Sequence, residues 1–133
     1  MGNGRRQNAL LVEIIIAVLF FALSATVILD VFATAYLQTT YADACNAAIS
    51  DAQNVAARVY TGDDPETVLT AEGFVGEDNI WQREGEGYTL MVELTQTVTE
   101  AGHLRTAYVT AMRGEDAIVE LPCSRYIPEG VAQ

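Results

Sequence analysis

The chain has 133 residues, half of them apolar, and a formal net charge of −11, with 18 acidic residues against 7 basic ones, all arginine. An acidic chain repels phosphate backbones, which argues against direct binding of nucleic acid. The absence of lysine excludes a surface fibre that is joined covalently through lysine amines. The length allows one compact domain beside a long apolar N-terminal segment.

Residues 9–29 form a nearly unbroken apolar stretch whose single charge is Glu13. About 20 apolar residues cross a bilayer as a helix, at about 1.5 Å per residue. Arg5 and Arg6 precede the stretch, and positive residues beside a first span stay in the cytoplasm. We therefore expect a cell-membrane protein with one span, a cytoplasmic N-terminus and an extracellular C-terminal domain.

A second targeting interpretation starts from Ala33-Thr34-Ala35, a sequence at which signal peptidase could release a soluble domain. The apolar run is longer than a usual signal core, and Glu13 lies where such cores avoid charge. These two features favour the anchored form.

Neither Pro nor Gly occurs between Leu10 and Tyr60, so one long helix is predicted there. Residues 9–32 form its transmembrane half, and residues 33–62 form an amphipathic half with an apolar face at helical spacing. We expect this face to pack on a sheet through Ile49, Ala52, Ala56 and Val59. Gly62 and Pro65 are suited to ending the helix.

Residues 63–87 are predicted to be a loop region with one short helix that begins at Pro65 and is capped by Asp64. Several acidic residues in this region raise the possibility of calcium binding. None of them follows the alternating ligand pattern of a calcium loop. Solvated acids are therefore the preferred interpretation, and no metal site is predicted.

Apolar residues recur with a period of two from Tyr88 onward, which predicts strands. The first places Tyr88, Leu90, Val92, Leu94 and Val98 on one face. Two further strands are expected at 104–112 and 117–121, with turns at 101–103 and 113–116. Such short connections allow only antiparallel pairing, so residues 88–133 should form a meander and a C-terminal tail. The predicted fold class is α+β: a long N-terminal helix packed on an antiparallel meander.

The basic residues Arg5 and Arg6, followed by an apolar helix with Glu13, resemble the N-terminus of type IV pilins and type II secretion pseudopilins. In that family a basic leader is removed, and Glu is the fifth residue of the mature chain. The resemblance places the cut between Asn8 and Ala9, although the family usually has Gly where this chain has Asn8. It implies a pilin-like fold and assembly through Ala9 and Glu13.

The function that the resemblance implies is that of a structural subunit in a type IV pilus, competence or type II secretion-like apparatus. The implied partners are the membrane, other pilin-like subunits and an assembly platform. The alternative is a membrane-tethered extracellular binding module that does not polymerise. No small-molecule substrate is expected under the first interpretation.

Two cysteines leave two alternatives open. Cys45 shares the apolar face of the helix, and Cys123 has the parity of Val119 and Leu121 in the last strand. A disulfide between them is permitted outside the cytoplasm. Otherwise both are small buried apolar residues.

The sequence offers no catalytic set. The single histidine, His103, is expected in a hairpin loop, and no Ser-His-Asp set or glycine-rich phosphate loop can be assembled. Two cysteines and one histidine cannot complete a structural zinc site. We therefore expect neither an enzyme nor a cofactor.

Overall fold

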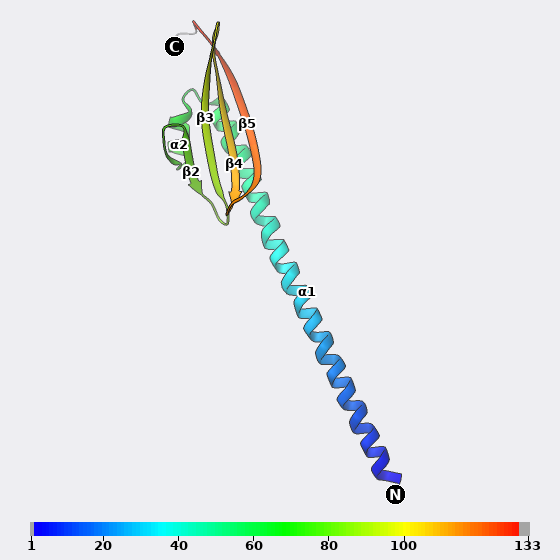
Figure 1. The fold of residues 1–133 in the computed structure, drawn as a ribbon. Helices are drawn as coiled ribbons and strands as arrows, with labels where there is room; N and C mark the ends of the chain where they lie inside the picture. The colour runs from blue at the N-terminus through cyan, green and yellow to red at the C-terminus, as the bar shows by residue number, and fades with distance from the viewer. Residues whose placement is uncertain (1, 131–133) are drawn as a thin grey trace. The chain divides into compact units, whose positions relative to one another are not determined.

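The computed structural model describes residues 2–130 of the chain (Figure 1). It divides into two units, Met1–Tyr41 and Ala42–Gln133. The helices are α1 (Gly2–Thr61) and α2 (Pro65–Ala71), and the strands are β1 (Val75–Glu77), β2 (Ile80–Glu84), β3 (Thr89–Thr99), β4 (Gly102–Arg113) and β5 (Asp116–Pro128).

Helix α1 is continuous, as the absence of helix breakers predicts. It ends at Thr61, and the following Gly62 donates its backbone N–H to the Arg58 carbonyl at 2.9 Å. A Cβ atom on Gly62 would lie 2.5 Å from a methyl group of Val68 in α2. Glycine is needed here because α2 packs directly against the end of α1.

The five strands form one antiparallel sheet in the order β1-β2-β3-β4-β5. This confirms the predicted meander. The segment 63–87, which was expected to be a loop region, contains the predicted short helix but also two strands, β1 and β2. These strands have only 3 and 5 residues, and glycines lie beside them, so their alternation is too short to be distinguished from loop sequence.

Strand β5 is longer than its sequence predicts. The predicted strand covers residues 117–121, whereas β5 runs from Asp116 through Pro122 to Pro128. Proline is tolerated because β5 lies at the edge of the sheet, where one side of the strand needs no hydrogen-bond donors.

The core lies between one face of the sheet and the C-terminal part of α1 (Figure 1). The buried stripe of α1 consists of Ala48, Ala52, Val55 and Val59. Of the four helix residues predicted to be buried, Ala52 and Val59 are, whereas Ile49 and Ala56 are half-buried at the margin. The sheet contributes Leu90, Val92, Leu94, Ala107, Val109 and Ala111.

Val98 is a correction to the predicted core. It has the same parity as Leu90, Val92 and Leu94, yet 81% of its surface is exposed. Its partner across β4 is His103, which lies in a strand and not in a loop as expected. This row lies two residues beyond the row of Gln96 and Arg105, and Arg105 already bonds to Asp63, a residue after the end of α1. The helix therefore does not reach Val98.

Candidate functional site

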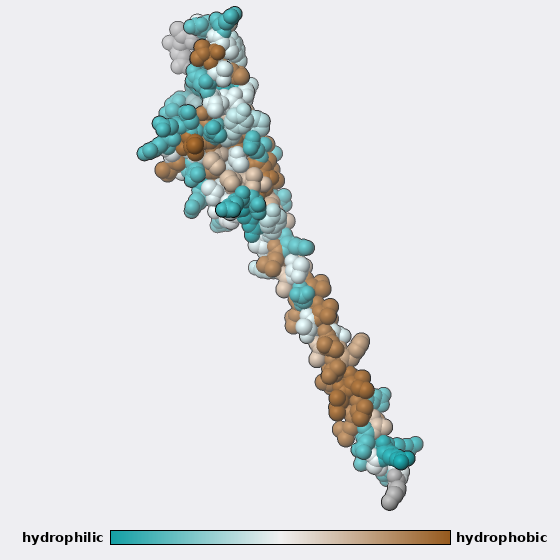
Figure 2. All heavy atoms as spheres, in the orientation of Figure 1, coloured by the Kyte–Doolittle hydropathy of each residue, from teal (hydrophilic) through white to brown (hydrophobic). Residues whose placement is uncertain are grey.

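The first unit of the structure carries an extended exposed apolar surface. We call residues 9–29 the apolar segment. Figure 2 shows a band of hydrophobic side chains along the side of the helix that faces the viewer. Its large side chains are all more than half exposed, and Phe20 and Phe21 reach 72% and 77%. The helix is long and apolar enough to cross a membrane by length and composition.

Glu13 and Ala9 lie one helical turn apart on α1, and both are exposed. They share a face with Asn8, Val12 and Ile16. The structure thus places the predicted assembly pair and the predicted cleavage position on one side of the helix. This face carries a carboxylate in apolar surroundings, where a charge is costly unless it finds a partner or reaches the interface.

A polar network fastens α1 to the sheet at the side of β2. Asp51 accepts two hydrogen bonds on one carboxylate oxygen, from Arg83 Nη2 at 2.5 Å and from the Tyr88 hydroxyl at 2.8 Å. Burial and the hydrogen bond to Asp51 raise the pKa of Tyr88 above its usual value. All three side chains are partly buried, so the network lies at the edge of the apolar core.

Arg83 extends this network to the loop after α2. Its Nη1 donates to the Glu72 backbone carbonyl at 2.9 Å, and its guanidinium lies 4.8 Å from the centre of the Phe74 ring. The Glu72 carboxylate also pairs with Arg58 on α1. Arg83 therefore joins α1, α2 and β2, which explains an arginine on the inner face of a strand.

Arg105 and Arg125 bind the chain at the end of α1 and in the two residues after it. Arg105 donates to the Asp63 carbonyl at 3.0 Å, and Arg125 donates to the carbonyls of Tyr60 and Gly62 at 3.3 and 3.1 Å. The last carbonyls of a helix have no partner within the helix and carry partial negative charge. Arg125 therefore satisfies the Tyr60 carbonyl in the last turn of α1, and the two arginines together bind the carbonyls of Gly62 and Asp63, which follow the helix.

Sequence reasoning missed both arginine contacts, although a signal was present. Arg125 has the parity of Leu121 and Cys123, so it lies on the face that packs against the helix. A cation at an inward position near the end of a helix indicates a bond to the helix carbonyls.

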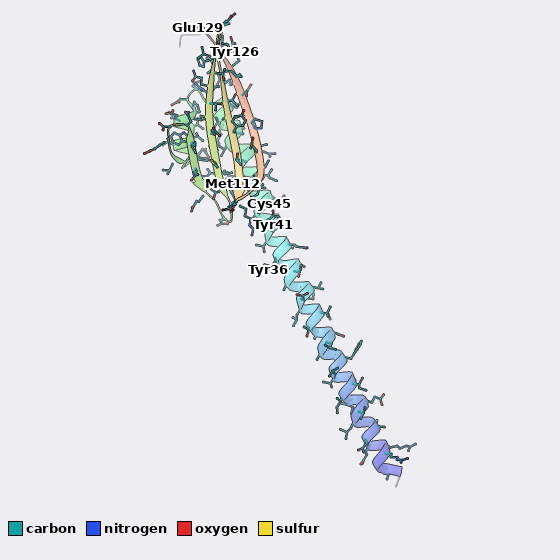
Figure 3. The ribbon with its side chains drawn as sticks, in the orientation of Figure 1. Tyr36, Tyr41, Cys45, Met112, Tyr126 and Glu129 are labelled. Atoms are coloured by element: carbon teal, nitrogen blue, oxygen red, sulfur yellow. The ribbon has the colours of Figure 1, made fainter. Side chains whose placement is uncertain are left out.

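The two cysteines are free thiols, and the disulfide does not form. Cys123 lies beside Val59 and Tyr60 in a small void, whereas Cys45 precedes Val59 by 14 residues. That interval is a rise of about 21 Å at about 1.5 Å per residue, and a disulfide needs Cα atoms within about 7 Å. In Figure 3, Cys45 lies near the Met112 end of the sheet, opposite the Tyr126 end. The alternative of two separate, partly buried thiols fits the structure.

The acidic loops do not converge on a metal site. Among residues 2–130, no group of three or more His, Cys, Asp or Glu side chains is placed to hold a metal ion. Asp64, the predicted N-cap of α2, instead accepts a hydrogen bond from the Thr67 hydroxyl at 2.5 Å. That bond lowers the pKa of the Asp64 carboxyl below its usual value.

Comparison with protein-family models, curated proteins and solved structures finds no match to this chain.

Proposed function

We propose that the chain is a pilin-like structural subunit, anchored in the membrane by the apolar segment and assembled through that segment into a helical polymer. The observation that carries the proposal is the exposure of the segment on all sides. Its side chains find no cover within residues 2–130, so lipid or other helices must cover them. The resemblance of the N-terminus to pilins supports the view that helices of other subunits cover the apolar segment in the assembled polymer.

The division of α1 supports the same function. From Ala42 onward the helix buries a narrow stripe of small residues against the sheet, while residues 9–29 present apolar side chains all round. The second half of the helix is thus part of the folded extracellular domain, and the first half leaves its apolar side chains free to pack against lipid or other helices. In this proposal Glu13 finds its partner in the ammonium at Ala9 after the leader is removed, either in its own chain or in a neighbour.

Cysteine crosslinking in native membranes tests the proposal. In a Cys45→Ser, Cys123→Ser background, one variant carries Leu11→Cys with Ile28→Cys, and a matched control carries Ala17→Cys alone. Neighbours that are staggered along a polymer bring different positions together, so the paired variant should give a ladder beyond dimers. The single variant can give no species larger than a dimer. Further pairs with other spacings cover the unknown stagger between subunits.

The second part of the experiment adds Glu13→Gln to the variant that carries Leu11→Cys with Ile28→Cys. This substitution should abolish the ladder while membrane insertion is retained, because it removes a charge from the span. Dimers alone, or no crosslinks at any spacing, would overturn the polymer and leave the membrane-tethered binding module.

A further inference from the structure

Strand β5 is the long open edge of the sheet. The strand order puts β1 and β5 at the two edges, and β1 has 3 residues against 13 for β5. An edge strand presents unpaired N–H and C=O groups, to which another strand can bind. The backbone of β5 therefore decides whether a second chain can extend this sheet.

The hydrogen-bond alternation identifies which residues of β5 face outward. Leu94 in β3 donates its N–H to the Asn79 carbonyl at 2.8 Å, on the side away from β4. In antiparallel pairs the backbone groups alternate in direction, so odd residues of β3 bond to even residues of β4. Odd residues of β4 then bond to odd residues of β5, among them Cys123 and Arg125. The outward positions are Glu120, Pro122, Ser124, Tyr126 and Pro128.

Two of these five outward positions are proline. Proline has no N–H, and its ring occupies the place where a neighbouring strand's carbonyl would approach. Closer to the β4–β5 turn, Met112 pairs with Ala117 and Ala111 with Val119, so Ile118 is an extra residue in a β-bulge. Every stretch of the edge is thus interrupted within a few residues.

Packing does not account for these prolines. Pro122 and Pro128 are both exposed. Pro122 does not end the strand, since β5 continues for six more residues to its last residue, Pro128. Their shared property is their outward register.

We infer that the β5 edge is closed to strand addition, so that neither a second copy of this chain nor an extended peptide can lengthen the sheet there. Partners that meet this edge must bind through side chains. The inference is independent of the proposed polymer: it requires only that sheets of neighbouring chains remain separate, whether or not the helices associate.

Amide hydrogen exchange on the full chain in detergent micelles gives the first test. The N–H groups of Ser124 and Tyr126 should exchange quickly, and those of Cys123 and Arg125, which bond to β4, should exchange at least about tenfold more slowly. Protection of Ser124 and Tyr126 equal to that of Cys123 would overturn the inference, because it would mean that the edge is already paired.

The second test restores the missing donors with Pro122→Val and Pro128→Val together. The variant should associate through β5 and protect the amides of Ser124 and Tyr126 at high protein concentration. Ser124→Val is the matched control, since it adds an apolar strand former at the same edge without adding an N–H group, and it should behave as the wild type. Association of the control, or none in the double variant, would overturn the role of the prolines. If the double variant does not fold, the exchange pattern of the wild type decides the question.

Discussion

Arg105 and Arg125 face each other directly across β4 and β5, yet both guanidinium groups donate to backbone carbonyls at the end of α1 and in the two residues after it. Like charges opposite one another in a sheet are normally destabilising. The partial negative charge of the helix end offsets this repulsion, so the pair binds the helix to the sheet at its last turn.

Loss of one of these arginines should destabilise the C-terminal domain. For Arg125→Met we expect a loss of about 1–2 kcal/mol in the free energy of unfolding, because two charge-assisted hydrogen bonds disappear while the apolar stem is kept. Urea unfolding followed by Trp81 fluorescence measures it. Arg125→Lys keeps the charge and should recover part of the loss. An unchanged unfolding midpoint for Arg125→Met would show that water replaces the two hydrogen bonds of Arg125 at no cost in stability.

The two buried alanines of α1 should tolerate no larger side chain. Ala52 is 0% exposed, so Ala52→Leu forces the helix away from the sheet and should cost about 1–3 kcal/mol. Ala57→Leu is the matched control, because Ala57 is exposed on the same helix and a leucine there meets solvent. Equal unfolding midpoints for the two variants would contradict the packing of α1 on the sheet.

Tyr88 should make stability fall at alkaline pH. Its pKa in the folded chain is raised above the ordinary 10.0, chiefly by burial and then by its hydrogen bond to Asp51. The folded chain therefore keeps the proton that the unfolded chain loses. The contribution of Tyr88 is complete below about pH 10 and is lost as the pH rises through the raised pKa.

Unfolding free energies of the wild type and Tyr88→Phe, compared between pH 8 and 11, isolate this contribution from the other tyrosines. The difference between the two proteins should be constant below pH 10 and should shrink above it. A difference that is independent of pH would mean that Tyr88 titrates alike in both states.

Thiol labelling should find two free cysteines. The native chain should take up two alkyl groups without prior reduction, and its mobility should be the same with and without reductant. Burial raises the pKa of the Cys123 thiol, so this residue should be alkylated more slowly near neutral pH than after unfolding. Labelling that requires reductant would restore the disulfide that was expected between Cys45 and Cys123.

Local sequence determined the fold class of this protein. Unbroken helix-forming sequence from Leu10 to Tyr60 was enough to predict α1, because each residue of a helix bonds only to its near neighbours. The alternation from Tyr88 and the short turns were enough to predict β3, β4 and an antiparallel meander. The apolar segment and Glu13 were likewise visible without a structure.

Only the tertiary structure decided which residues are covered, where β5 ends and which side chains pair across elements. Val98 has the pattern of a core residue but is exposed, because it lies two residues beyond the row of Gln96 and Arg105, where α1 has already ended. Pro122 reads as a strand terminator but lies within β5, since only strand order shows that its missing N–H faces an open edge. Arg83, Arg105 and Arg125 find their partners on elements distant in sequence, and such long-range pairing leaves no periodic signal in the chain.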